Sequence, residues 1–182
     1  MEIKEIKPEA MALPRDMSKL PQGKYGPIYP KTPACYGFSV IAKVMPGMEE
    51  HLYNHAKVIE KGIAENPDLL KVLQAHYLRW LVFEINGEKY MMYQGIFDTD
   101  FDKYCEDASV IFGQSGIKSA FEALEGWPKD YATNPAAIVR FFREHHWPSF
   151  LEYCEHPYAT CEEIKKGLNL RAAFSGVLDQ MQ

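Results

Sequence analysis

The sequence has no long hydrophobic run and no excess of positive charge. No apolar run approaches the ~18 residues that a membrane-spanning helix needs. The formal net charge of -5 and the pI near 5.7 argue against the basic face that nucleic-acid binding requires. The N-terminal segment, MEIKEIKPEAMALPRD, alternates in charge and lacks the apolar block of a secretion signal. We therefore expect a cytoplasmic protein with neither a membrane nor a nucleic-acid partner.

The sequence also lacks the common short motifs of catalytic and metal-binding proteins. It contains no C-x-x-C pair, no His-Glu-x-x-His, no glycine-rich phosphate loop and no nucleophile elbow. In a reducing compartment, the cysteines are expected to be isolated thiols. They are Cys35, Cys105, Cys154 and Cys161.

Two further patterns resemble metal sites but are incomplete. His51 and His55 have the i, i+4 spacing that lets two imidazoles hold one metal, but no third ligand is indicated, so we interpret them as a solvated helix flank. Asp98, Asp100 and Asp102 alternate, but no EF-hand glycine or glutamate follows, so helix capping is the expected role. No metal site is predicted.

Proline divides the chain into two parts. Residues 1–35 hold half of the twelve prolines, which exclude a regular helix or a central strand. We expect this segment to be an extended arm that lies over the domain or over a partner subunit. Residues 36–182 are expected to form one α+β domain with additional C-terminal helices.

The first strand and helix follow from apolar periodicity. Residues 38–45 alternate, with Phe38, Val40, Ala42 and Val44 on one wholly apolar face. A helix is predicted over residues 48–65, before Asn66-Pro67. Its expected core stripe is Leu52, Ala56, Ile59 and Ile63.

The clearest local signal is a β-hairpin. Residues 76–85 and 89–98 flank Asn86-Gly87, the preferred pair for a type I′ turn. This turn places Glu84 opposite Lys89. One face then pairs His76 with Phe97, Leu78 with Gly95 and Trp80 with Tyr93, and the other pairs Tyr77 with Ile96, Arg79 with Gln94, Leu81 with Met92 and Phe83 with Tyr90. Both faces are mostly apolar, so both should be covered.

The downstream pattern completes a βαββαβ order. Helices are predicted from Asp98–Asp100 to about residue 112 and over 136–145, with a short helical piece at 117–124. A strand is predicted over 147–153 and a C-terminal helix over 162–181. The apolar stripe of that helix is Ile164, Leu168, Leu170 or Arg171, Phe174 and Leu178.

The expected fold is thus a ferredoxin-like antiparallel sheet with helices on one face. The other face is expected to be covered by the sheet of a second copy, in a homodimer with an apolar pocket. Alternatively, helices after residue 113 cover it within one chain.

Three short segments resemble the dimeric α+β barrel superfamily. MPGMEE (45–50) resembles its common strand–helix turn. HYLRW (76–80), YQGIFD (93–98) and the helix at 164–172 are similar to a bacterial subgroup of uncharacterised members. The resemblance covers residues 36 to about 178. It implies a relation to haem enzymes (dye-decolourising peroxidases and chlorite dismutases), cofactor-free monooxygenases and small binding proteins. Because these functions differ, the resemblance indicates where a site lies and not its chemistry.

Arg79 opposite Gln94 is the first candidate site. A charge in a mostly apolar strand face needs a partner or an anionic ligand. The guanidinium could hold a carboxylate, a haem propionate or an enolate oxygen. The alternative is a structural ion pair.

His76 is the second candidate, together with Trp80, Tyr93 and Gly95 on its own face. The imidazole could act as a general base or haem ligand, and Gly95 leaves space. The alternative is a polar contact at the start of the strand, with the aromatic rings in the core. Strand alternation directs His76 and Arg79 to opposite faces, so they cannot form a simple dyad unless a bulge intervenes.

Three functions remain open. The first is an oxidative enzyme acting on an apolar or aromatic molecule, with His76 or Arg79 polarising the substrate and Trp80, Tyr93, Gln94 and Gly95 binding it. The second is a haem-binding protein whose ligand is His145, His146 or His156; a helix C-terminus also favours such residues. The third is a binding protein without catalysis.

Overall fold

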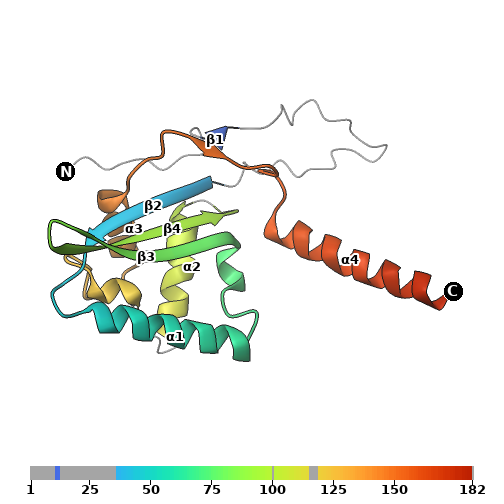
Figure 1. Ribbon diagram of the computed structural model, residues 1–182, viewed down its shortest axis with the longest axis horizontal. Helices are drawn as coiled ribbons and strands as arrows, with labels where there is room; N and C mark the ends of the chain where they lie inside the picture. The colour runs from blue at the N-terminus through green and yellow to red at the C-terminus, as the bar shows by residue number, and fades with distance from the viewer. Residues whose placement is uncertain (1–10, 13–35, 100, 115–118, 182) are drawn as a thin grey trace.

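A computed structural model describes residues 11–12, 36–99, 101–114 and 119–181. The described residues form α+β structure with a three-stranded antiparallel sheet, in the order β2-β4-β3, and four helices (Figure 1). The strands are β1 (Met11–Ala12), β2 (Tyr36–Lys43), β3 (Ala75–Ile85), β4 (Glu88–Phe97) and β5 (Glu152–Tyr153). The helices are α1 (Glu49–Glu65), α2 (Phe101–Gln114), α3 (Pro135–His145) and α4 (Cys161–Gln180), with 3₁₀ turns η3 (Lys71–Leu73) and η4 (Ala120–Ala123). Apart from β1, the predicted arm lies outside the described residues.

The hairpin has the predicted turn. Asn86 and Gly87 both adopt positive φ, 52° and 77°, as a type I′ turn requires. Lys89 pairs with Glu84, and the predicted register holds down to the pair of Tyr77 with Ile96.

The predicted pair of His76 with Phe97 is wrong. A bulge between Ala75 and Tyr77 absorbs one residue, so Ala75 faces Phe97. His76 is the extra residue, and its side chain bonds to Asp98 at the end of β4.

The helix-facing side of the sheet forms the core. The predicted alternation is confirmed, because Phe38, Val40 and Tyr93 are at most 3% exposed while Ser39 and Gln94 on the other face are half-buried. The ring of Phe38 lies at the centre of an aromatic cluster with Tyr93, Phe97, Phe101, Tyr104 and Phe142. These rings join the sheet to α2 and α3.

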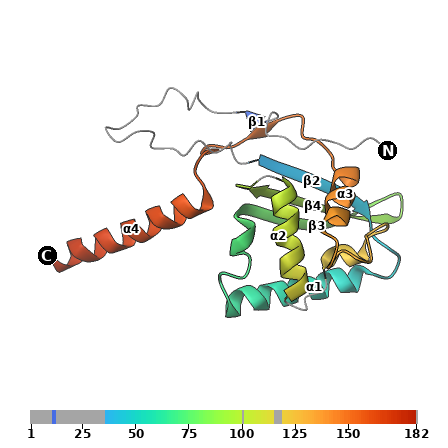
Figure 2. The ribbon, with the colours of Figure 1, turned by 180° about the vertical axis from the view of Figure 1, so that it is seen from behind.

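Helices α1, α2 and α3 lie on the same face of the sheet (Figures 1 and 2). In α3, the predicted Ile138, Phe141 and Phe142 are buried. In α1, by contrast, Leu52 is the buried member of the expected stripe. The other members are Ala56 (exposed), Ile59 (half-buried) and Ile63 (39% exposed). The sheet therefore leaves most of the α1 stripe uncovered.

The predicted fourth strand does not join this sheet. After α3, the chain contacts β2 through one bridge, Val40 with His146, and through the N–H of Trp147, which donates to Ser39 O at 2.8 Å. The next residue, Pro148, has no N–H to extend the ladder. Within the predicted span 147–153, the structure has a strand at Glu152–Tyr153 alone, and that strand pairs in parallel with β1.

The face of the sheet opposite the helices is open over β3 and β4. Tyr77 is 52% exposed and Ile96 is 37% exposed, and none of the described helices lies over them. Near β2, Glu152 Oε1 approaches Gly37. An apolar face is therefore presented by the hairpin, as the sequence predicts.

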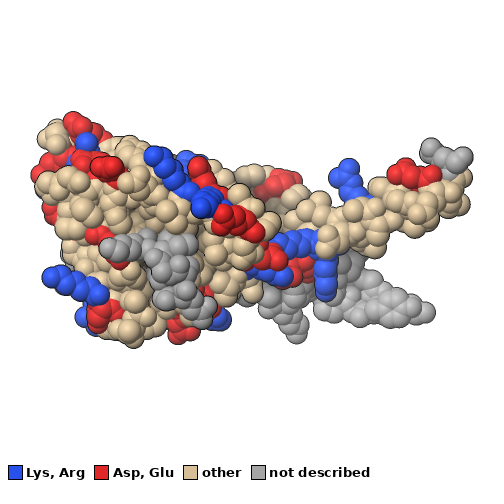
Figure 3. All heavy atoms as spheres, turned by 90° about the horizontal axis from the view of Figure 1, so that it is seen from below, with Lys and Arg blue, Asp and Glu red and all other residues tan. Residues whose placement is uncertain are grey.

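Helix α4 extends away from the sheet (Figure 1). The expected stripe is exposed from Ile164 to Phe174, with Leu168 at 58% and Phe174 at 63%. Four of the charged residues of this helix lie within its first six positions, and its outer part carries few charges in the space-filling view (Figure 3). Among the described helices, none has the length and apolar character needed to cross a membrane.

Candidate functional site

A cleft opens between α1 and the edge strand β3. Its outer lobe has a volume of about 370 Å³, and its inner lobe has a volume of about 40 Å³. The outer lobe is lined chiefly by Leu52, Ala56, Ile59, Trp80, Val82 and Met91. The inner lobe continues between Leu70, Leu73, Leu78, Tyr104, Ala108 and Phe142. His55, Ile59 and Trp80 line both lobes, so the two are adjacent.

The start of α1 is fixed to the sheet and to the loop beyond α2. Lys89 Nζ lies 2.8 Å from Glu49 Oε1, which ties the first turn to the hairpin. His51 Nε2 lies 3.2 Å from Ser119 O. These contacts hold the helix beside β3 without closing the gap, because Ala56 is too small to reach the strand.

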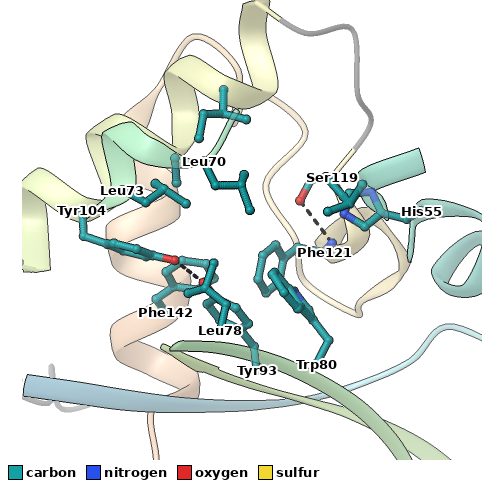
Figure 4. Close-up of a pocket in the computed structure, with 13 residues that line it drawn as sticks. His55, Leu70, Leu73, Leu78, Trp80, Tyr93, Tyr104, Ser119, Phe121 and Phe142 are labelled. Carbon is teal, nitrogen blue, oxygen red and sulfur yellow. Dashed lines mark hydrogen bonds between the residues drawn. The ribbon is translucent and has the colours of Figure 1, made fainter. Parts of the chain in front are cut away.

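Aromatic rings form the sheet side of the cleft. Trp80 is 39% exposed, and its ring lies 5.0 Å from that of Tyr93. The Tyr93 ring in turn packs edge-on against Phe121 at 5.1 Å. Figure 4 shows Trp80 and Tyr93 pointing from the sheet towards the space below α1 and α2. A flat apolar molecule would find a ring surface here.

Two tyrosine hydroxyls meet at the inner end of the cleft. Tyr93 from β4 and Tyr104 from α2 share a hydrogen bond (Figure 4). Burial, and then the neighbouring Tyr104, raise the pKa of Tyr93 well above its usual value, and burial also raises the pKa of Tyr104. Both side chains therefore stay protonated at neutral pH and act as a neutral polar pair.

The polar groups of the outer lobe come from α1. They are the side chains of Tyr53, His55 and Glu60. The sequence predicts a solvated helix flank for His51 and His55, so the place of His55 in the cleft was missed. The available signal was its position next to Ala56, a stripe residue that is too small to fill the gap.

The structure does not bring the predicted site residues together in one place. Trp80 and Tyr93 line the cleft. Gly95 lies against the core, where an added Cβ would meet Phe38 Cε1 at 3.1 Å. The glycine therefore allows Phe38 to pack and opens no space in the cleft.

Arg79 and Gln94 lie on the open face, away from the cleft. The guanidinium of Arg79 packs over the Tyr77 ring, with 5.5 Å between its carbon and the ring centroid. Gln94 Nε2 donates to Ser39 Oγ at 3.2 Å. Their predicted roles in catalysis and substrate binding stay predictions, and they concern the open face and not the cleft.

His76 belongs to a second cluster, with Asp98 and Cys161. His76 Nε2 lies 2.5 Å from Asp98 Oδ1, and the N–H of Cys161 donates to Asp98 Oδ2 at 2.7 Å. The Asp98 carboxylate thus joins the hairpin to α4, a different role from the capping of α2 that the sequence predicts. His76 is not among the residues that line either lobe of the cleft.

Burial and the neighbouring charge shift the pKa in opposite directions for Asp98 and in the same direction for Cys161. Burial raises the pKa of Asp98, but the hydrogen bonds from His76 and from Cys161 outweigh it and lower the pKa overall. For Cys161, burial and the Asp98 carboxylate raise the thiol pKa to about 12. The carboxylate is therefore favoured as an anion and the thiol as a neutral group.

The late histidines lie outside the cleft. His145 Nδ1 contacts Phe141 O at 2.8 Å, and the buried His146 contacts Ser39 O through Nδ1 at 3.1 Å. His156 is exposed. These residues therefore do not place an imidazole in either lobe.

Comparison of the chain with protein-family models, with curated proteins and with solved structures gave no match. The resemblance to dimeric α+β barrels therefore still rests on the short segments of the sequence that carry it. Any function assigned to this chain has to come from the geometry of the cleft and of the His76 cluster.

Proposed function

We propose that the cleft between α1 and β3 binds an apolar or aromatic small molecule. The observation that carries this proposal is the uncovered stripe of α1. Ala56 and Ile59 face Trp80 across a space of about 370 Å³. Ligand pockets typically have volumes of about 300–1,000 Å³ and apolar walls. Burial of a ligand here would cover apolar surface that the chain itself leaves in contact with water.

The lining favours a flat molecule with one polar end. The ring of Trp80 offers a surface for stacking, and the imidazole of His55 and the carboxylate of Glu60 lie on the α1 side. A polar group on the ligand could bond to these side chains while its rings lie against Trp80.

Oxidation of the bound molecule by dioxygen is the second candidate function, and His55 favours its first step, the removal of a proton. Among the described residues that line the two lobes, it is the only histidine. A neutral imidazole beside a bound aromatic molecule can accept a proton as a general base. In this proposal His55 takes the part that the sequence predicts for His76 or Arg79.

The cleft lacks the haem ligands that the sequence predicts. The histidines predicted as axial ligands, His145, His146 and His156, do not line it.

A ligand screen with two tryptophan variants tests the binding proposal. Ala56→Trp places a large ring in the cleft, whereas Ala64→Trp places the same ring on an exposed part of α1 outside it. Thermal shift and fluorescence titration with anilinonaphthalene sulfonate and a panel of aromatic acids and phenols are the measurements. We expect wild type and Ala64→Trp to bind with similar affinity and Ala56→Trp to bind about tenfold more weakly or worse, a loss of about 1.4 kcal/mol.

Two results would contradict the binding proposal. One is that no compound of the panel stabilises or titrates the wild type. The other is that both tryptophan variants lose affinity equally. For the enzymatic alternative, His55→Gln should abolish turnover of a bound compound while keeping its affinity within a few-fold.

We further propose that the domain has a ferredoxin-like arrangement. The strand order β2-β4-β3 follows the first, third and second strands of a βαββαβ unit. The single bridge between Val40 and His146 lies where a fourth strand would run beside β2.

The same proposal includes a homodimer formed through the open face of the sheet. Tyr77, Phe83, Met92 and Ile96 present apolar surface there. Two copies of this face would cover each other. Sedimentation equilibrium should give a dimer for wild type and a monomer for Met92→Glu, which places a charge in this face. A monomeric wild type at micromolar concentration would overturn the homodimer.

A further inference from the structure

We propose that His76, Asp98 and Cys161 form a binding site for a divalent metal ion of the zinc type. The site lies apart from the cleft and does not depend on the function proposed for it. It joins the sheet to α4.

Three separate segments bring the ligand atoms together. His76 comes from the bulge of β3, Asp98 directly follows β4, and Cys161 is the first residue of α4. One ligand atom from each side chain lies within 4.8 Å of the other two. A metal ion at their centre would need only small side-chain movements to be bound by all three.

The site is partly shielded from water. The side chain of Asp98 is 6% exposed and that of His76 is 19% exposed. On metal binding, bonds from both groups to the metal would replace the hydrogen bond between His76 Nε2 and Asp98 Oδ1, while the Cys161 N–H still donates to Oδ2 and fixes the orientation of the carboxylate. Such support positions a ligand before the metal arrives.

The donor set selects the type of metal. An imidazole, a carboxylate and a thiolate are the three ligand types that zinc proteins use. Calcium and magnesium require oxygen ligands, so the thiol and the imidazole disfavour them. Three protein ligands leave a fourth tetrahedral position for water or a small ligand.

A nucleophilic role for Cys161 fits the geometry less well. In a cysteine–histidine pair, the imidazole must contact the thiol. Here Asp98 contacts both His76 and the Cys161 backbone, so the carboxylate, and not the imidazole, connects the two. On metal binding, a sulfur–metal bond replaces the sulfur–hydrogen bond of Cys161, and the proton passes to solvent.

Metal binding would strengthen the attachment of α4. Its first turn is held by the contact between Asp98 and the Cys161 N–H. A capping box adds two hydrogen bonds: Thr160 Oγ1 accepts from the Glu163 N–H at 3.2 Å, and the Thr160 N–H donates to Glu163 Oε2 at 2.9 Å. A metal ion would add a cross-link between this turn and the hairpin.

Cobalt(II) substitution tests the site in the whole, untagged chain. After treatment with chelator, the protein is titrated with cobalt(II) and then with zinc(II) in competition. Cobalt(II) bound by a thiolate gives a charge-transfer absorption that oxygen and nitrogen ligands alone do not give. Variants Cys161→Ser, His76→Asn and Asp98→Asn remove one ligand each, and Cys154→Ser changes a half-buried thiol outside the cluster.

We expect one equivalent of cobalt(II) with a charge-transfer band in wild type and in Cys154→Ser. The band should disappear in Cys161→Ser, and zinc(II) affinity should fall by about tenfold or more in His76→Asn and Asp98→Asn. Circular dichroism confirms that each variant is folded, and any unfolded variant is replaced by His76→Gln or Asp98→Ser. Absence of the band in wild type, or its equal loss in Cys154→Ser, would overturn the proposal.

Discussion

Trp80 and Tyr93 lie directly opposite each other in β3 and β4, with their ring centroids 5.0 Å apart. Tyr93 is buried while Trp80 is 39% exposed, so this pair marks the boundary between the core and the cleft. The distant hairpin turn determines this pairing, because it sets the register of both strands.

Truncation of Trp80 should therefore affect both ligand binding and folding. We expect Trp80→Ala to lower the free energy of unfolding by about 3 kcal/mol, because the ring loses its burial as well as its aromatic pair, and to weaken binding of any aromatic ligand about tenfold. Urea denaturation and fluorescence titration measure the two effects. Trp147→Ala, at a 59% exposed site outside the cleft, is the control. Equal losses of affinity in both variants would contradict the assignment of Trp80.

The tyrosine pair should show strong coupling. Tyr93→Phe or Tyr104→Phe leaves the other buried hydroxyl without its partner, which should cost about 1–3 kcal/mol of stability. The double variant should lose less than the sum of the single losses, because no orphaned hydroxyl remains. A double-mutant cycle in urea measures the coupling. Strict additivity would show that the two hydroxyls do not depend on each other.

Gly95 should prove to be a packing residue. In Gly95→Ala the new Cβ meets Phe38 Cε1 at 3.1 Å and Leu78 Cδ2 at 3.4 Å, so we expect a loss of about 1 kcal/mol and unchanged ligand affinity. Gly167→Ala in α4, where no atom lies within 4 Å of the added Cβ, should be neutral or slightly stabilising. If Gly95→Ala abolishes binding while stability is unchanged, the predicted role of Gly95 at the ligand is correct.

The lowered pKa of Asp98 predicts acid sensitivity in the metal-free protein. The folded state lowers the pKa of Asp98 below its usual value of ~3.9. The ionised carboxylate therefore stabilises the folded protein at pH values above ~3.9, and this stabilisation disappears as the pH falls through the folded-state pKa. Asp98→Asn should be less stable than wild type at neutral pH, and the difference should shrink in acid. Thermal unfolding across this range is the measurement, with Asp179→Asn at an exposed position of α4 as the control. A difference that does not change with pH would contradict the linkage.

The hairpin could be predicted from the sequence because its signals are local. Asn86-Gly87 fixes the turn, and the turn fixes the register of Trp80 and Arg79. The bulge at His76 could not be predicted in this way, because the His76 side chain bonds to Asp98, which lies outside the strand ladder. The third member of that cluster, Cys161, lies on a helix that no local pattern places beside the hairpin.

The cleft was predicted only in part. Periodicity identified the apolar stripe of α1, and alternation placed Trp80 and Tyr93 on one face. An apolar stripe, however, looks the same in a sequence whether another element packs on it or not. The gap exists because Ala56 is small and because β3 is an edge strand, and the second of these facts depends on the tertiary fold.

Helix α4 has a thermodynamic consequence of its own. Every side chain from Ile164 to Val177 is exposed, and isolated helices of this length are only marginally stable in water. Its amide hydrogens should therefore exchange with solvent through local unfolding, while those of the central strand β4 exchange only when the whole domain opens. The two elements thus report two different free energies, and a partner that binds folded α4 will raise both of them, because the helix is unfolded in each of the two open states.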